Sequence, residues 1–195
     1  MSRSYPESRV GQRHRVELEC AAAIAATLDA AHYVVNLTPL GTLTHGAVRV
    51  PDPDASMAAT VVPGRNALLL DLAVSAAVGC GADAVVYGAH AGDHPIHPDC
   101  PPEWFAPYRE MVRLGIQGVA CADFEVLAPF LAWSEADIVR LGAVLGVPFR
   151  RTWSCRRGGS VHCGTCGTCV ERQEAFAGAG IVDPTTYAAP AGRVG

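Results

Sequence analysis

Apolar residues along the chain alternate between helical spacing and short uninterrupted runs. Helical spacing predicts helices over residues 15–28 and 67–79, near residues 103–114, and over residues 134–145. The last of these has Ser134 at its N-cap position, with an acidic residue in the first turn. Short apolar runs bounded by polar residues predict buried strands at residues 32–37, 83–88 and 122–127.

The predicted elements follow one another as helix, strand, helix, strand, helix, strand, helix. This alternation predicts an α/β fold, with a mostly parallel sheet covered by helices on both faces. The series begins with a helix, because residues 1–10 are polar, contain Pro6 and predict a loose tail. A nucleotide-binding sheet usually opens with a strand and a glycine-rich phosphate loop. Neither G-x-G-x-x-G, Walker A nor Ser-Gly-Gly-x-Asp-Ser occurs in the sequence.

The composition is that of a globular protein. Of the 195 residues, 50% are hydrophobic and 17% are charged, which excludes an intrinsically disordered chain and suits one domain with a small appendage. The formal net charge of −4 disfavours a protein that coats nucleic acid. No apolar run reaches the roughly 20 residues that span a bilayer, and the first residues hold no secretory signal. The sequence therefore predicts a cytoplasmic protein with no membrane partner.

Half of the eight cysteines lie close together in the sequence. The four scattered ones are expected to be buried thiols: Cys20, Cys80, Cys100 and Cys121. The other four follow the pattern C-x7-C-x2-C-x2-C: Cys155, Cys163, Cys166 and Cys169. Two-residue gaps with Gly and Thr let a tight turn direct the sulfurs to one point, and four thiolates make a closed tetrahedral zinc site. Such a site would fold residues 150–178 and would not itself catalyse a reaction.

The cysteine spacing is also compatible with different chemistry. An iron–sulfur cluster can use CxxCxxC spacing, although the usual Cys-Pro is missing, and four unrelated reduced cysteines would need no metal. His162 could also replace one cysteine as a ligand. A zinc ion with four thiolates carries excess negative charge, which neighbouring arginines could offset: Arg150, Arg151, Arg156, Arg157 and Arg172.

Two segments deliver polar side chains to the predicted start of a helix. Gln12, Arg13 and His14 precede the first helix and could bind an anion or a polar base edge, although a solvated helix start explains them equally well. Arg65 could clamp a phosphate through two hydrogen bonds, and Asn66 could cap the second helix. Helix capping alone would also explain this second segment.

The loop after the predicted strand 83–88 is rich in histidine and proline. Loops at the carboxyl ends of parallel strands line the ligand crevice of α/β sheets, so Asp93 or Asp99 could bind hydrogen-bond donors of a ligand. A second metal site is the alternative, with ligands drawn from His90, Asp93, His94 and His97.

Four segments together resemble the 7-cyano-7-deazaguanine synthase family, in the pyrophosphatase-loop group of ATP-using enzymes. These segments are GQRHR (residues 11–15), VPGRN (62–66), the GAHAGD…HPDC loop (88–100) and LGVPFRRTWSCRRGG…HCGTCGTCVERQEAF (145–176). They occur in the order of the family and cover nearly the whole chain. The last is the most specific, because it embeds the four cysteines in their usual surroundings.

This resemblance implies an adenine nucleotide alpha hydrolase-like, Rossmann-like fold and a ligase of queuosine or other 7-deazapurine biosynthesis. The enzyme would convert 7-carboxy-7-deazaguanine, ammonia and ATP, with Mg²⁺, into the nitrile through an acyl-adenylate. It would hold one structural zinc ion on Cys155, Cys163, Cys166 and Cys169. The nucleotide and substrate would lie near Gln12, Arg13, His14, Arg65, Asn66, Asp93 and Asp99. A homodimer is one possible assembly, and no direct contact with nucleic acid is expected.

The sequence departs from the family pattern in several places. The resemblance begins after the first strand and the Ser-Gly-Gly-x-Asp-Ser loop that cradles the ATP phosphates. We therefore expect an N-terminally truncated α/β domain at residues 1–149, a zinc-binding segment at 150–178 and a tail at 179–195. Glu135 stands where the family has Lys, and Arg156 stands where it has Tyr. The alternative function is a catalytically inactive fragment or partner subunit that keeps the zinc fold and the deazaguanine pocket.

Overall fold

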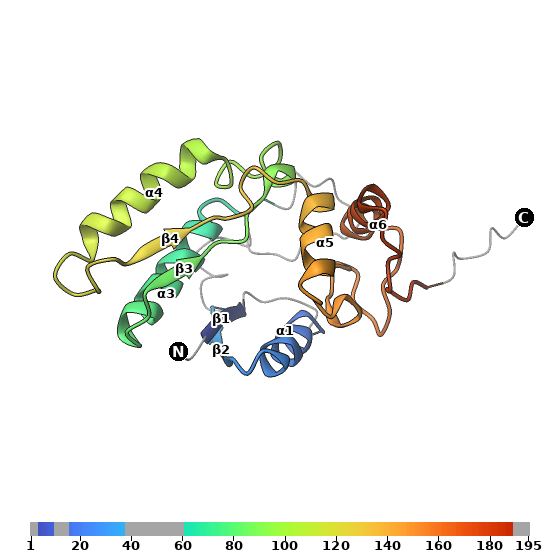
Figure 1. Cartoon of the computed structure of the whole chain (residues 1–195), viewed down its shortest axis with the longest axis horizontal. Coiled ribbons are helices and arrows are strands. Elements are labelled where there is room, and N and C mark those ends of the chain that lie inside the picture. The colour runs from blue at the N-terminus through green and yellow to red at the C-terminus, as the bar shows by residue number, and fades with distance from the viewer. Residues whose placement is uncertain (1–3, 10–15, 38–60, 189–195) are drawn as a thin grey trace, which may run out of the picture. The chain divides into compact units, whose positions relative to one another are not determined.

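A computed structural model describes residues 4–9, 16–37 and 61–188 of the chain, with side chains from residue 16 onward. The chain divides into two compact units, which are described separately. One unit comprises Val61–Ile138, and the other comprises Met1–Thr60 together with Val139–Gly195. Figure 1 labels the helices and strands of both. The expected division at residues 149 and 178 stays a prediction.

The unit of residues 61–138 contains a short parallel ladder. Strand β3 (Ala84–Val86) pairs with β4 (Glu125–Leu127), so that Val85 lies opposite Val126. Helix α3 (Arg65–Gly79) precedes β3, and helix α4 (Pro102–Gly115) precedes β4. A short 3-10 turn, η2 (Ala91–Asp93), lies in the loop between β3 and α4. Each strand is therefore preceded by a helix, as in a parallel α/β fold.

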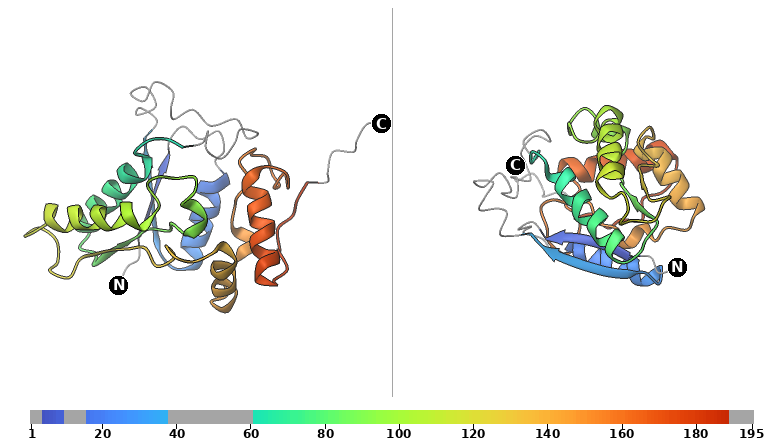
Figure 2. Two further views of the ribbon diagram at one scale, coloured as in Figure 1. Left: turned by 90° about the horizontal axis from the view of Figure 1, so that it is seen from above. Right: turned by 90° about the vertical axis from the view of Figure 1, so that its left-hand side faces the viewer.

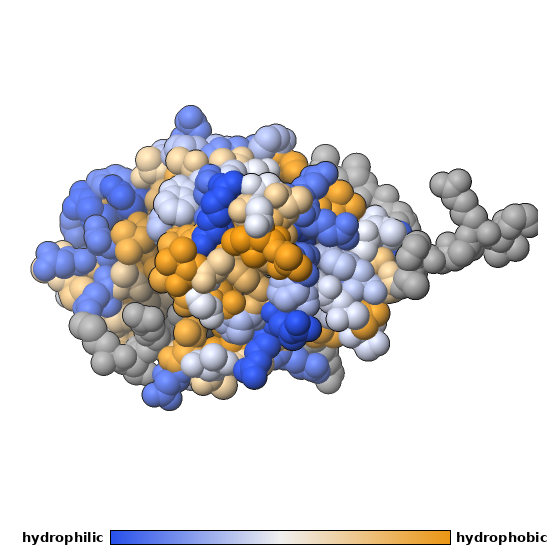
Figure 3. All heavy atoms as spheres, turned by 45° about the vertical axis from the view of Figure 1, so that its right-hand side comes forward, coloured by the Kyte–Doolittle hydropathy of each residue, from blue (hydrophilic) through white to orange (hydrophobic). Residues whose placement is uncertain are grey.

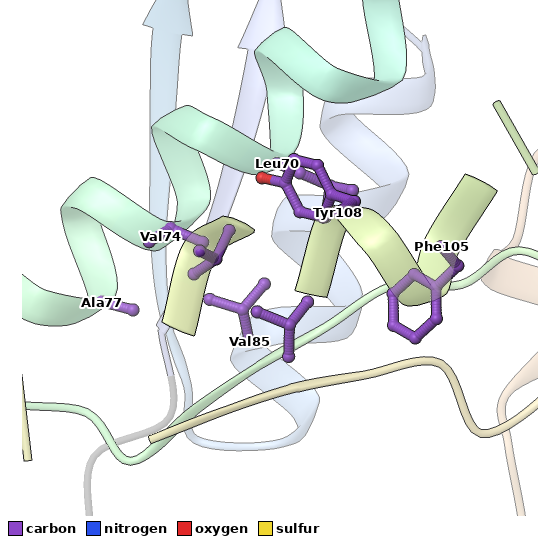
Figure 4. Close-up of a cluster of buried hydrophobic side chains, with 8 residues drawn as sticks. Leu70, Val74, Ala77, Val85, Phe105 and Tyr108 are labelled. Atoms are coloured by element: carbon purple, nitrogen blue, oxygen red, sulfur yellow. The ribbon is translucent and has the colours of Figure 1, made fainter. Parts of the chain in front are cut away.

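Helices α3 and α4 cover one face of this ladder. Figure 4 shows side chains of both helices converging on Val85. Together they form one buried cluster of Leu70, Val74, Ala77, Val85, Phe105, Tyr108, Val112 and Val126. The Tyr108 hydroxyl, on α4, donates a hydrogen bond of 2.8 Å to the Asp71 carboxylate, on α3, which joins the two helices. The next residue of the strand, Val86, alternates to the other face and is 62% exposed.

The other unit contains a second parallel ladder. Strand β1 (Ser4–Arg9) pairs with β2 (Ala31–Asn36) along its whole length, and helix α1 (Val16–Thr27) connects them. Figure 2 shows the two strands side by side. The expectation of an α/β fold with parallel strands is therefore confirmed, although the described residues form two separate ladders.

The expectation of a loose tail at residues 1–10, and of a series that begins with a helix, is wrong. Residues 4–9 form β1 although they show no alternation of apolar and polar side chains. Backbone N–H and C=O groups pair in a ladder whatever the side chains are, so a polar strand gives no periodic signal. Pro6 lacks the N–H donor and is tolerated in a strand only at an edge or a bulge.

The C-terminal part of this unit is built around two helices that pack together. Helix α5 (Glu135–Val144) begins just before the boundary between the units, and η3 (Phe149–Arg151) and α6 (Gly167–Ala179) follow it. Val139 of α5 packs with Ala175 and Phe176 of α6 in a buried cluster, and Figure 1 shows the helices side by side. This packing holds α6, whose N-cap and first turn carry two of the clustered cysteines.

The expected burial of the scattered cysteines is only partly confirmed. Cys100 is buried and Cys20 is half-buried, but Cys80 and Cys121 are exposed. Cys80 lies just beyond the last residue of α3, and Cys121 lies in the loop between α4 and β4. Exposure at helix ends and in loops depends on how the segment packs rather than on residue type, so composition alone could not place these two thiols.

Some large apolar side chains also remain at the surface. Val144 and Leu145, at the end of α5, are 84% and 70% exposed. Hydrophobic patches lie beside hydrophilic ones on the face in Figure 3. Apolar surface of this kind is common where proteins contact one another, and the expected homodimer stays a prediction. Within the described ranges, no helix combines the length and the hydropathy that would be needed to cross a membrane.

Gly142 provides a test of the α5 packing. A Cβ added at this helical position would lie 2.5 Å from Cζ of Phe149, whose ring meets Phe176 edge-on at 5.0 Å. At an exposed helix position Gly→Ala would stabilise by about 1 kcal/mol. Here we expect Gly142→Ala to lower the free energy of unfolding by about 1–3 kcal/mol, because overpacking outweighs helix propensity. Urea unfolding of the metal-loaded chain measures the change, and a more stable variant would contradict this packing.

Candidate functional site

The four clustered cysteines meet in space. Their Sγ atoms all lie within 4.8 Å of one another, and those of Cys163 and Cys169 are 4.0 Å apart. Zinc–sulfur bonds of about 2.3 Å place the corners of a tetrahedron about 3.8 Å apart. Three of the cysteines are buried, and Cys163 is half-buried. The donor set therefore fits one four-coordinate soft metal ion with no open coordination position.

A tight turn directs two of the sulfurs to this point. Backbone N–H groups of Thr165 and Cys166 donate to Sγ of Cys163 at 3.4 and 3.3 Å. Gly164, which lies between Cys163 and Thr165, has a φ of +75°, a backbone conformation that favours glycine. Burial acts to raise the pKa of Cys163, but these N–H groups and the Thr165 hydroxyl outweigh it and lower that pKa to about 6. The turn thus favours the thiolate, which is the form that binds a metal.

The turn ends at Cys166, where α6 begins, and the other two cysteines lie in the first turn of α6 and in a separate segment. Cys166 is the N-cap residue of α6, and Cys169 lies in its first turn. Cys155 lies eight residues upstream of Cys163, whose N–H donates to Sγ of Cys155 at 3.4 Å. The Thr168 hydroxyl donates to the Ser154 carbonyl at 2.6 Å, so α6 is held directly to the residue before Cys155. The metal would therefore cross-link two segments that already contact each other.

A half-buried arginine connects the same segments. Arg172, on α6, donates to the Thr152 hydroxyl at 2.8 Å and to the Phe149 carbonyl at 3.1 Å. Its Nε donates to the Thr185 hydroxyl at 2.8 Å and lies 3.4 Å from the Asp183 carboxylate. From the sequence, Arg172 is one of five arginines that could offset the negative charge of a zinc ion with four thiolates. The structure gives it a specific carboxylate partner and a role in holding three segments in place.

His162 does not join the metal-ligand group. Its Nε2 accepts a hydrogen bond of 3.1 Å from the Ser154 N–H, and its ring lies against Trp153 at 4.1 Å. Burial, followed by the charge of Arg172, lowers the pKa of His162, so the imidazole is held neutral as an acceptor. The metal-ligand group found in the described ranges consists of the four cysteines alone.

A second polar cluster lies beyond the carboxyl end of β3. The Asn66 side chain donates to Oδ1 of Asp99 at 2.9 Å, and the Asn66 backbone N–H donates to Oδ2 at 3.3 Å. Asp99 therefore caps the start of α3 from a loop 33 residues away in the sequence. The expectation that Asn66 caps this helix is wrong, because Gly64 occupies the N-cap position and makes no side-chain cap.

Sequence reasoning missed Tyr87 and the role of Cys100 in this cluster. The Tyr87 hydroxyl lies 3.2 Å from the Asp99 carbonyl, to which it donates, and 3.3 Å from Sγ of Cys100. The Asn66 side chain also reaches that sulfur, at 3.6 Å. Burial, followed by the contact with Cys100, raises the pKa of Tyr87, so the phenol stays protonated. The end of β3, the loop and the start of α3 are thereby held together, and only the position of Tyr87 near the end of a predicted strand could have indicated this.

The loop histidines do not form a second metal site. His90 Nδ1 accepts from the Gly92 N–H at 3.2 Å, and its Nε2 lies 3.5 Å from Asp93 and 3.6 Å from Glu135. The Asp93 carboxylate also accepts from the His90 N–H at 3.1 Å, which closes the η2 turn. His94 and His97 contribute to no metal-ligand group in the part of the chain that the structure describes. Glu135 thus contacts the loop after β3.

The structure brings together some of the predicted ligand-binding residues. Asn66 and Asp99 contact each other, whereas Asp93 is engaged by His90. Arg65 is the first residue of α3, directly before Asn66. Gln12, Arg13 and His14 lie outside the described residues. The direct contact of these residues with a nucleotide or substrate stays a prediction.

The fold and the site define a class of protein: a parallel α/β chain with a polar loop after β3 and a C-terminal centre of four cysteines. The family model described as "Queuosine biosynthesis protein QueC" matches residues 7–180, and the chain belongs to this family. It is 45% identical to the 7-cyano-7-deazaguanine synthase of Allorhizobium ampelinum, over 92% of this chain and 79% of the relative. The synthases of Rhizobium rhizogenes and Ruegeria sp. are 46% and 43% identical, over 92% of this chain and 79% and 80% of the relatives.

The cysteine group predicts that metal content depends on specific thiols. We expect Cys169→Ser to lose the bound metal ion, because a hydroxyl replaces a buried thiolate in a closed site. Cys80→Ser is the matched control, since Cys80 is exposed and outside the group. Elemental analysis of the purified variants measures the metal per chain. Equal metal content in both variants would contradict the assignment.

Proposed function

We propose that this chain is an ATP-dependent ligase that converts 7-carboxy-7-deazaguanine and ammonia into 7-cyano-7-deazaguanine. The observation that carries this proposal is the family match over residues 7–180. Relatives named 7-cyano-7-deazaguanine synthase that share 43–46% identity over 92% of the chain support it. At that identity and coverage, the chemistry of the relatives is the simplest account of this site.

The reaction requires two activations of the same carbon. ATP first converts the carboxylate into an acyl-adenylate, and ammonia displaces AMP to give the primary amide. A second ATP then adenylates the oxygen of this amide and releases pyrophosphate, and departure of AMP with the loss of the two amide N–H protons leaves the nitrile. The protein has to bind an anionic nucleotide, orient a planar heterocycle and keep water from the activated acyl group.

The cluster beyond β3 is suited to orient a ligand. Ligands of parallel α/β sheets bind outside the carboxyl ends of the strands, and Tyr87 and Asp99 lie at that end. Each oxygen of Asp99 accepts one hydrogen bond from Asn66, and a carboxylate oxygen can accept a second one. We propose that Asp99 accepts hydrogen bonds from the N–H donors of the heterocycle and that Arg65 donates to a phosphate of ATP. The ATP would be bound together with Mg²⁺. Gln12, Arg13, His14 and Asp93 complete the proposed ligand site.

The metal is proposed to be one zinc ion held by Cys155, Cys163, Cys166 and Cys169. Four thiolates leave no open position, so the ion supplies a structural cross-link and does not activate water. The chain's own groups do the rest: N–H donors stabilise the thiolates, and Arg172 and Thr168 hold the segments that carry them. A cytoplasmic location, a homodimeric assembly and ammonia as the nitrogen donor belong to the same proposal.

The zinc-loaded chain should release AMP when it is given ATP, Mg²⁺, ammonium and the carboxylate, and mass spectrometry should detect the nitrile. We expect Asp99→Asn to lower kcat/KM by about 10- to 100-fold, since a lost charged hydrogen bond costs about 1.5–3 kcal/mol. Glu110→Gln is the matched control, because Glu110 is an exposed carboxylate on α4 paired with Arg113. Its activity should equal that of the parent.

Two results would count against this assignment. Full activity of Asp99→Asn would remove Asp99 from the site while leaving the ligase. Binding of the carboxylate without AMP release, in a preparation with its full metal content, would favour the inactive partner over the ligase.

A further inference from the structure

The chain returns to the cysteine centre after α6. Residues 181–188 follow this helix, and Tyr187 forms a parallel bridge with His162, the residue before Cys163. The Ala188 N–H donates to the His162 carbonyl at 2.7 Å. The C-terminal segment therefore pairs with the metal-binding segment through its backbone, next to one of the ligands.

The Tyr187 ring forms part of the wall around the sulfur atoms. It packs with Trp153 and Cys163 against the buried cluster of Cys155, Cys166 and Cys169. A Cβ added at Gly164 would lie 3.3 Å from the Tyr187 ring, so the ring lies directly on the turn between Cys163 and Cys166. Cys163 is the one ligand of the four that is not fully buried. Cys163 is therefore the cysteine of the four that lies nearest to solvent, and Tyr187 packs beside it.

A hydrogen-bond relay holds Tyr187 in this position. Its hydroxyl donates to Oδ2 of Asp183 at 2.5 Å, while Oδ1 accepts from the Thr185 N–H at 3.0 Å. Arg172 lies 3.4 Å from the same oxygen and is anchored to the Phe149 carbonyl and to Thr152. Burial opposes ionisation of Asp183, but the hydrogen bonds of Tyr187 and Thr185 and the charge of Arg172 lower its pKa. The bond from Tyr187 is thus charge-assisted, and the relay connects the segment to α6 itself.

We propose that residues 181–188 act as a clasp that limits the rate at which the metal ion leaves its four cysteines. To leave, the ion must lose the Cys163 thiolate and pass the turn at Gly164, which Tyr187 covers. Tyr187 is not a ligand, so opening the clasp changes the rates of release and uptake much more than the ratio between them. This inference depends on the proposed metal site, but it does not depend on the ligase activity.

The test measures metal release from the full-length zinc-loaded chain to a chromogenic chelator in excess. Tyr187→Phe removes only the hydroxyl, and we expect release to be about 10-fold faster, because a charge-assisted hydrogen bond is lost. Tyr187→Leu also removes the aromatic ring, and we expect a further acceleration. Tyr33→Phe is the matched control, since Tyr33 is a 59% exposed tyrosine on β2, and it should release at the parental rate.

Metal content and far-UV circular dichroism keep the outcomes distinct. A purely structural role for Tyr187 would lower the metal content or the helix content, whereas a clasp leaves one ion per chain and changes only the rate. Parental release rates in both Tyr187 variants, at full metal content, would overturn the clasp and leave the metal site standing. A parent chain that takes up no zinc would overturn the metal site and the clasp together.

Discussion

The convergence of four cysteine sulfurs is the constraint around which residues 149–188 are arranged. Residues 149–188 contain little apolar core of their own, and their buried clusters are small. A metal ion on the four sulfurs would join the Cys155 segment to the start of α6 and would add its binding energy to this small core. The hydrogen bonds of Arg172, Thr168 and the clasp residues would then hold the segments that carry the cysteines in one arrangement.

The proposed ligand site depends on a different constraint, the parallel pairing of β3 and β4. Parallel strands place their carboxyl ends at the same edge, and at this edge the loop after β3 carries the polar groups. The Asp99 carboxylate accepts a hydrogen bond from the Asn66 N–H, which has no acceptor within α3. The Tyr87 hydroxyl donates to the Asp99 carbonyl and so holds this loop at the end of β3. The residues proposed to bind the ligand therefore also form hydrogen bonds with the backbone of the fold itself.

Local spacing predicted the cysteine centre, because residues three apart in a tight turn are neighbours whatever the rest of the chain does. The same spacing could not reveal that Asp99 meets Asn66 or that Asp183 meets Arg172, since these contacts depend on how distant segments pack. The sequence did not predict strand β1, because its ladder is formed by backbone groups and most of its side chains are polar. The prediction that Cys80 and Cys121 are buried was wrong, because it rested on residue type, whereas the position of a residue in the fold decides its exposure.

The structural role of the metal centre is tested most directly by hydrogen–deuterium exchange of the zinc-loaded chain, before and after a chelator removes the metal. We expect amides of α6 and of residues 181–188 to lose protection on metal removal, while amides of α3 keep theirs. Unchanged protection in α6 after verified removal of the metal would contradict a structural role for the four cysteines.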